Sequence, residues 1–240
     1  MDRQPLALVT GAAHRLGKTF ALTLARRGFA ILLHHYHSVD EATATADEIR
    51  AIGVAAYLVQ SNLTEDTDLF CLLAALDSLP CQLKVLVNSA AIMKRTEIKT
   101  TVPEDWDASF ALNLRVPFLL TQQATGRMPG GGLIVNVTDA GAHKLWNSCP
   151  AYVVSKAALE TLTRLQAKAY APDIRVNAIA PGLVLPSDDL TPVEWGKLVE
   201  RLPLKRTTSQ EDVAGALGFL LDNPSVTGQT VVVDGGYSLI

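Results

Sequence analysis

The sequence predicts a single α/β domain built on a parallel sheet. Short runs rich in Val, Ile and Leu alternate with longer segments of helical periodicity along the whole chain, which is typical of βαβ units. The chain has 240 residues, 48% of them hydrophobic, which is enough for one buried core. We therefore expect one doubly wound domain over residues 1–240, with a seven-stranded parallel sheet flanked by helices.

The expected strands are the apolar runs at 6–10, 30–35, 55–60, 84–88, 132–138, 174–180 and 229–233. The expected helices lie between them, at 16–27, 39–51, 65–78, 104–126 and 151–171. Gly28 and Gly53 stand where the first two helices should end, and Ser38 with Glu41 has the spacing of a capping box. In a Rossmann-type sheet of this kind, the ligand crevice lies beyond the carboxyl ends of the strands.

Residues 183–209 have no clear period, apart from a short helix that Thr191, Pro192 and Glu194 predict as N-cap, first-turn proline and capping partner. A long segment on the crevice side is typical of a substrate-binding loop or lid. We expect residues 183–209 to have that role.

Composition narrows the partner to a small molecule. The net charge is −3 and no Lys/Arg run is present, so the sequence lacks the signature of a nucleic-acid or membrane-surface binder. No apolar run has the length of a membrane span or of a secretion signal. The 3 cysteines have no metal-ligand spacing, so we expect reduced thiols, a cytoplasmic location and no metal site.

A dinucleotide-binding turn is expected where the first strand meets the first helix. The segment runs from Thr10 to Gly17, with Gly11, Arg15 and Leu16 between them, and its small residues let backbone N–H groups approach a pyrophosphate. Glycine at this place is also ordinary turn chemistry, so the turn alone is weak evidence.

The end of the second strand favours NADPH over NADH. Folds that prefer NAD place an acid there, whereas this chain has His35, Tyr36, His37 and Ser38 and no carboxylate before Asp40. Arg15 could supply positive charge to a 2′-phosphate, and Ser38 a hydroxyl near a helix N-terminus. For Arg15 the alternative is a solvated surface residue, and for Ser38 an ordinary N-cap.

Tyr152 and Lys156 are the candidate catalytic pair. Their four-residue spacing places phenol and ammonium on one helical face. A cation within ~4–6 Å favours the phenolate, so we expect Lys156 to lower the pKa of Tyr152 into a range useful for proton transfer. A Tyr-x-x-x-Lys pair can also be incidental on an amphipathic helix.

Together these motifs resemble the short-chain dehydrogenase/reductase family over the whole chain. Asn88-Ser89-Ala90-Ala91 is similar to the family's N-N-A-G, and Asn113 to the asparagine that holds a relay water. The resemblance implies that Tyr152 protonates substrate and that Lys156 tunes it and binds the nicotinamide ribose. It extends the cofactor-binding set to Asn62, in place of the usual aspartate, and to Leu63, Asn88, Ser89, Ala90, Pro181, Gly182 and Leu183.

One departure from the family points to the substrate. Asp139 stands where the family has a catalytic serine, and an ionised carboxylate accepts hydrogen bonds but cannot donate one to a developing alkoxide. Aspartate here, the T-G-A-A-x-R-L-G turn and the H-Y-H segment with its serine resemble the pteridine reductases and dihydromonapterin reductases. This resemblance implies NADPH-dependent reduction of a pterin C=N bond, with Asp139 catalytic beside Tyr152, Lys156 and Asn113.

The expected substrate-contacting residues are Met93, Asp139, Trp146 and Tyr152. Met93 occupies the place of the aromatic ring on which the pteridine reductases stack the pterin, and Trp146 could replace that ring. Trp146 is equally compatible with a place in the core or in a subunit contact.

Two other functions remain open. An NADPH-dependent carbonyl or 3-oxoacyl thioester reductase would need a protonated Asp139 or the hydroxyl of Thr138 as donor. A dinucleotide-sensing regulator would keep the fold without turnover. Whatever the substrate, the family resemblance implies a homodimer or homotetramer formed by the helices at 104–126 and 151–171.

Overall fold

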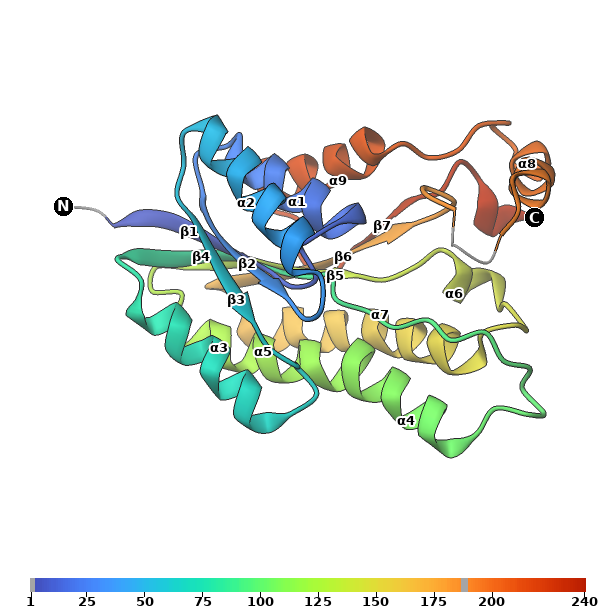
Figure 1. Ribbon diagram of the computed structural model, residues 1–240, viewed down its shortest axis with the longest axis horizontal. Coiled ribbons are helices and arrows are strands. Elements are labelled where there is room, and N and C mark those ends of the chain that lie inside the picture. The colour runs from blue at the N-terminus through green and yellow to red at the C-terminus, as the bar shows by residue number, and fades with distance from the viewer. Residues whose placement is uncertain (1–2, 187–189) are drawn as a thin grey trace.

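The computed structural model describes residues 3–186 and 190–240 and places seven parallel strands in one sheet (Figure 1). The strands are β1 (Gln4–Val9), β2 (Ala30–His35), β3 (Ala56–Gln60), β4 (Cys81–Asn88), β5 (Gly132–Val137), β6 (Ile174–Pro181) and β7 (Thr230–Val233). Their order is β3-β2-β1-β4-β5-β6-β7, so the winding reverses between β1 and β4. The predicted fold class is confirmed. Ligands of doubly wound folds bind at such a reversal.

Helices cover both faces of the sheet (Figure 1). One face carries α1 (Arg15–Ala25), α2 (Val39–Ile52) and α9 (Gln210–Asp222), and the other carries α3 (Asp66–Ser78), α5 (Val116–Thr125) and α7 (Pro150–Tyr170). Alternate side chains of β1 point to opposite faces of the sheet. Ala7 and Val9 pack with the first set of helices, and Leu6 and Leu8 pack with the second. A central strand buried on both faces explains the continuous apolar runs of the sequence.

The structure refines one local prediction and corrects another. The helix expected at 104–126 is present as an unbroken run of α4 (Pro103–Phe110), a π-helical turn, η1 (Ala111–Arg115), and α5. Ser38 makes no side-chain capping bond, so the predicted capping box of α2 is wrong. Its ψ of 69° departs from the extended backbone of a capping residue. Gly53 does end α2, with a φ of +102°.

Several short elements gather beyond the carboxyl ends of the strands (Figure 1). They are α6 (Gly141–Lys144), α8 (Pro192–Arg201) and η2 (Tyr237–Leu239). The predicted start of α8 is confirmed, since Thr191 and Glu194 hydrogen-bond reciprocally. Residues 187–189 of the expected lid lie outside the described part of the chain.

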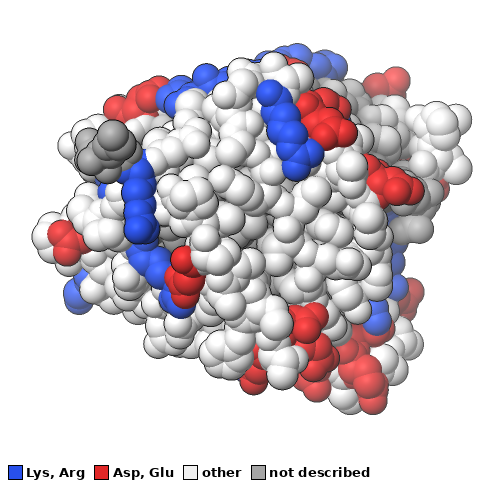
Figure 2. Space-filling view, turned by 60° about the vertical axis from the view of Figure 1, so that its left-hand side comes forward, with Lys and Arg blue, Asp and Glu red and all other residues white. Residues whose placement is uncertain are grey.

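On the face drawn in Figure 2, acidic side chains gather along the lower right edge, and basic side chains lie mostly at the left and top. Acidic and basic side chains lie there around a broad area of uncharged residues. Within residues 3–186 and 190–240, no helix combines the length and the apolar character that crossing a membrane requires.

Candidate active site

The turn between β1 and α1 is tightly packed against the end of β4. The Thr10 hydroxyl oxygen accepts hydrogen bonds from the backbone N–H groups of Ser89 and Ala90, both at 3.0 Å. Gly11 has a φ of +63°, and a Cβ on it would lie 2.9 Å from the Ala90 Cα. A Cβ on Gly17 would lie 2.0 Å from the Gly11 carbonyl oxygen. Both positions therefore require glycine.

The N-terminus of α1 fits an anion. Its first turn carries no acidic residue, and its N-cap, His14, makes no side-chain capping bond. Backbone N–H groups and the positive end of the helix dipole are therefore available to a phosphate. The Arg15 guanidinium donates to the carbonyl oxygens of Leu185, at 3.3 Å, and Pro186, at 3.1 Å. Arg15 thus contacts residues 183–209, and its contact with a 2′-phosphate stays a prediction.

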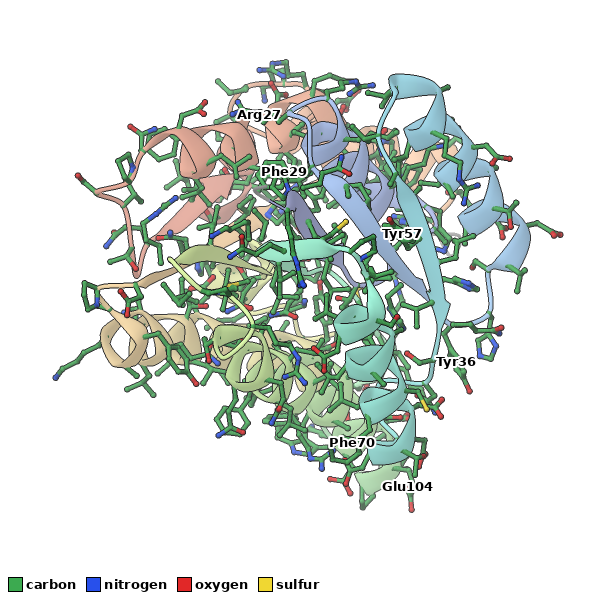
Figure 3. The ribbon with its side chains drawn as sticks, turned by 90° about the vertical axis from the view of Figure 1, so that its left-hand side faces the viewer. Arg27, Phe29, Tyr36, Tyr57, Phe70 and Glu104 are labelled. Carbon is green, nitrogen blue, oxygen red and sulfur yellow. The ribbon has the colours of Figure 1, made fainter. Side chains whose placement is uncertain are left out.

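The residues expected at the adenosine end lie along the β3 edge of the sheet. Figure 3 shows Tyr57 on β3 and Tyr36 just beyond the end of β2. The rings of Tyr36 and His37 lie with centroids 3.6 Å apart, next to Ser38. The Asn62 side-chain oxygen accepts bonds from the Thr64 backbone N–H, at 3.3 Å, and hydroxyl, at 2.8 Å. It already has partners at the place where we expected it to meet adenine.

The other predicted cofactor residues lie at or after the carboxyl ends of β3, β4 and β6. Asn88 ends β4 and donates to the Asn136 side chain at 2.8 Å, while its buried amide oxygen has no partner within the described residues. Pro181 ends β6, and a Cβ on Gly182 would lie 2.6 Å from the Asp234 Cα. Leu63 and Leu183 are buried at 2% and 7% exposure, so they can contribute backbone or apolar contact only.

Asp139 and Tyr152 are joined by a short hydrogen bond. The Tyr152 hydroxyl donates to Asp139 Oδ2 at 2.7 Å, and the Gly141 backbone N–H donates to Asp139 Oδ1 at 2.6 Å. Asp139 is the second residue after β5, and Tyr152 lies in the first turn of α7. Both carboxylate oxygens accept, so the carboxylate is held as an acceptor. The Thr138 hydroxyl donates to the Ile179 carbonyl oxygen inside the sheet, at 3.2 Å.

Asn113 ties this pair to the rest of the site. Its side chain accepts from the Ile92 N–H and donates to the Ile92 carbonyl oxygen, both at 2.9 Å, and it donates to the Ser155 hydroxyl at 3.1 Å. Ser155 in turn donates to the Tyr152 carbonyl oxygen at 2.7 Å. The π turn places Asn113 at 0% exposure, and such turns are frequent at functional sites.

The expectation that Lys156 lowers the pKa of Tyr152 is wrong for this structure. Burial first, then the charge and hydrogen bond of Asp139, raise the pKa of Tyr152 well above its usual value of 10.0. The Lys156 ammonium lies 5.7 Å from the phenol ring centroid and donates to the Val137 carbonyl oxygen at 2.6 Å. Burial lowers the pKa of Lys156 to about 8, although Asp139 opposes the shift. After burial, the largest influence on the phenol is therefore the Asp139 carboxylate and not the Lys156 ammonium.

Asp139 is itself perturbed. Burial raises its pKa above the usual value, while the bonds from Tyr152 and Gly141 and the charge of Lys156 oppose that rise. Five polar side chains thus form one group, in which Asp139 is half-buried and the other four are buried. We name it the polar network: Asn113, Asp139, Tyr152, Ser155 and Lys156. Sequence reasoning missed Ser155, although it lies inside the Tyr-x-x-x-Lys segment.

Trp146 lies between the polar network and the elements beyond the strand ends. It packs against Cys149, Tyr152 and Val153 on one side, and against a group that contains Leu202 and Tyr237 on the other. Its indole N–H donates to the Tyr237 hydroxyl at 2.8 Å. Sequence reasoning missed Tyr237. Met93, in the loop after β4, is 38% exposed.

The chain is similar to known proteins of one family. Residues 11–238 match the family described as enoyl-(acyl carrier protein) reductase. The chain is 34% identical, over its whole length and 89% of the relative, to 1-cyclohexenylcarbonyl-CoA reductase of Streptomyces collinus. It is also 34% identical to the 3-oxoacyl-[acyl-carrier-protein] reductase FabG of a Staphylococcus epidermidis strain, covering 96% of this chain and 97% of that one.

A similar protein of known structure has a different substrate. FolM alternative dihydrofolate reductase 1 from Brucella canis, complexed with NADP, superposes with a TM-score of 0.93 at 35% identity. The match covers 99% of this chain and 94% of that chain. Relatives at the same level of identity therefore divide between thioester and folate substrates.

Proposed function

The chain belongs to the short-chain dehydrogenase/reductase family, and we propose that it is an NADPH-dependent reductase of a C=N bond in a pterin or dihydropterin. It is an NADP-dependent oxidoreductase, since solved relatives of the same fold bind NADP or NADPH. The candidate substrates are of the dihydromonapterin, dihydrobiopterin and dihydrofolate type. The folate relative supports this class.

The geometry of Asp139 carries the proposal. Both of its carboxylate oxygens accept short bonds, at 2.7 Å from Tyr152 and at 2.6 Å from Gly141. A ketone reductase needs a donor at this place to stabilise a developing alkoxide, whereas a pterin offers amino and ring N–H groups to an acceptor. Thr138 does not replace the donor, because its hydroxyl is bonded within the sheet.

The chain's residues fit the dinucleotide. The glycine turn and the uncapped N-terminus of α1 would hold the pyrophosphate, with Arg15, Tyr36, His37 and Ser38 toward the 2′-phosphate. NADPH supplies the hydride when bound. Tyr152 holds the proton that goes to the substrate nitrogen, Asp139 orients the pterin, and Lys156 would bind the nicotinamide ribose. Asn113 holds the relay water on which the supply of protons to Tyr152 depends.

The alternative is a carbonyl or 3-oxoacyl thioester reductase. The FabG relative favours it, and so does burial of Asp139, which raises the pKa of that carboxyl and moves it toward the protonated donor that this reaction requires. A non-catalytic dinucleotide sensor is the outcome in which NADPH binds and no substrate turns over.

The decisive experiment follows NADPH consumption with dihydromonapterin, dihydrobiopterin, dihydrofolate and an acetoacetyl thioester as parallel substrates. The wild type should turn over a pterin much faster than the thioester. Asp139→Ser should lower pterin turnover by about 10²-fold and raise thioester turnover, because it exchanges an acceptor for a donor. Asp139→Asn is the control that removes charge without adding a hydroxyl. Turnover of the thioester alone by the wild type would establish the alternative.

The helical run from α4 through η1 to α5, together with α7, also supports self-association. A groove of ≈ 790 Å³ lies between α4, η1, α5 and α7, lined by Phe110, Leu114, Phe118, Leu162 and Leu165 among others. Phe118 and Leu165 are 41% and 63% exposed. A second copy of this chain can cover such a face isologously, as dimers usually do. Light scattering should give a dimer or tetramer that Leu165→Glu dissociates.

A further inference from the structure

His34 is a buried polar residue that the proposed chemistry does not use. It is the residue before the last of β2, and 3% of it is exposed. The strand pattern assigns it to the sheet core, where an imidazole with unmet hydrogen bonds would be costly. Its two ring nitrogens are both bonded, and the partners come from different parts of the chain.

The hydrogen bonds assign the tautomer. The Gly11 backbone N–H donates to His34 Nδ1 at 3.1 Å, so Nδ1 carries no proton. Nε2 then carries the proton and donates to the Ser61 carbonyl oxygen at 3.0 Å. Burial lowers the pKa of His34 to about 4, so the imidazole is neutral at pH 7 and Nδ1 remains an acceptor.

The backbone around His34 strengthens the same connection. The His34 carbonyl oxygen accepts from the Ala12 N–H at 2.9 Å, and the His35 carbonyl oxygen accepts from the Ser61 N–H at 3.1 Å. The end of β2 is thus hydrogen-bonded to the turn between β1 and α1 on one side and to the residue after β3 on the other. Gly11 has a φ of +63° and glycine is conformationally permissive, so the bond to His34 helps to fix the direction of its N–H.

We propose that His34 is a positioning residue for the dinucleotide: its imidazole holds Gly11 in register with the end of β3 and so fixes the pyrophosphate turn relative to the adenosine edge of the sheet. The inference rests on the proposed NADPH dependence. His34 touches no reacting atom and acts through the backbone of Gly11.

Two substitutions separate the ring's two contacts. In His34→Asn the side-chain oxygen has the position of Nδ1 and can still accept from Gly11, but nothing reaches Ser61. In His34→Gln the amide nitrogen has the position of Nε2 and can still donate to Ser61, but no acceptor meets Gly11. Leu32→Val, a buried change on the same strand, is the control for destabilisation alone.

The readouts are NADPH affinity, measured by fluorescence titration, and the thermal midpoint of the protein without dinucleotide. We expect the Kd for NADPH to rise about 5–10-fold in His34→Gln, the cost of about one hydrogen bond, and less than about 2-fold in His34→Asn and Leu32→Val. Both His34 variants should lower the midpoint.

Equal Kd changes in the two His34 variants, or changes that follow the midpoint as in Leu32→Val, would overturn the inference and leave the proposed function standing. If the wild type does not bind NADPH, both the inference and the proposed function are wrong. Tight NADPH binding with equal turnover of pterin by all variants, and equal Kd values, would mean that His34 serves the sheet alone.

Discussion

The polar network and the elements that lie over it are built in opposite ways. Asn113, Ser155 and Lys156 are at most 2% exposed, and each is bonded to backbone or to another member of the network. The other region, which we name the cover, comprises residues 141–146, which include α6, together with α8 and η2. It contains α8 without a single buried residue and Leu145, the residue after α6, at 70% exposure.

This difference assigns different tasks to the two regions. A buried network with satisfied hydrogen bonds holds its groups in one geometry, which proton transfer requires. A cover with few buried contacts belongs to the low-stability end of a structure, from which substrate-binding segments are drawn. We therefore expect changes in the network to affect turnover, and changes in the cover to affect substrate affinity.

The largest expected effect is on turnover, from Tyr152→Phe. Removing the hydroxyl that donates to Asp139 at 2.7 Å removes the proton donor, so kcat should fall by about 10²–10⁴-fold. The Kd for NADPH should change little, because the ring remains. Tyr170→Phe, at the other end of α7, is the matched control. Residual turnover near the wild-type level would remove Tyr152 from the proton path.

A substitution of Lys156 measures how much stability the buried ammonium of the polar network costs. Its folded-state pKa, about 8, is below the ordinary 10.5, so the folded protein holds this proton less tightly than the unfolded chain does. Lys156 therefore costs stability fully below about pH 8, and that cost disappears as pH rises toward 10.5. Lys156→Met should raise the free energy of unfolding by about 1–3 kcal/mol at pH 7, after allowance for the lost bond to Val137.

Urea unfolding of both proteins at pH 7, 8, 9 and 10 measures that difference, which should shrink as pH rises. Lys168→Met, on the exposed side of the same helix, should show no such trend. A difference that is constant with pH would mean that the ammonium is not desolvated in the folded protein.

The fold was readable from the sequence because buried parallel strands leave continuous apolar runs, and all seven were placed. The helix α9 was missed although Ser209 and Asp212 form a capping box and Val213, Leu217 and Leu220 are buried along one face. The π turn around Asn113 has no signal of its own, since its Ala, Leu and Arg residues are ordinary helix formers. In the structure, its Asn113 side chain is bonded to the Ile92 carbonyl oxygen and to Ser155, contacts between distant segments that local sequence does not indicate.

The candidate site was predictable in its residues but not in its electrostatics. Spacing placed Tyr152 and Lys156 on one helical face. The direction in which the Tyr152 pKa shifts depended on burial and on Asp139, which comes from the segment after β5. His34 had no signal, because its partners Gly11 and Ser61 meet only when β1, β2 and β3 pair.

The cover should control the KM for the pterin through Trp146 and Tyr237. Tyr237→Phe removes the hydroxyl that accepts the indole N–H at 2.8 Å, which frees the ring of Trp146. We expect KM to rise about 3–10-fold with kcat nearly unchanged, the effect of about one hydrogen bond. Tyr57→Phe, on the distant β3, is the control. A fall in kcat with unchanged KM would place Tyr237 with the polar network.

The smallest expected effect comes from removing a helix cap, and it compares the cover with the core directly. The two helices α8 and α9 begin with the same kind of capping box. Ser209 caps α9, which buries five residues in the core, whereas Thr191 caps α8, which buries none. Ser209→Ala should lower the free energy of global unfolding by about 1 kcal/mol. Thr191→Ala weakens its own helix by a similar amount, but that helix can open alone, so global unfolding should be unchanged. Only Thr191→Ala should raise the KM for the pterin, about 2-fold or more, and equal thermal losses in both variants would show that α8 unfolds with the core.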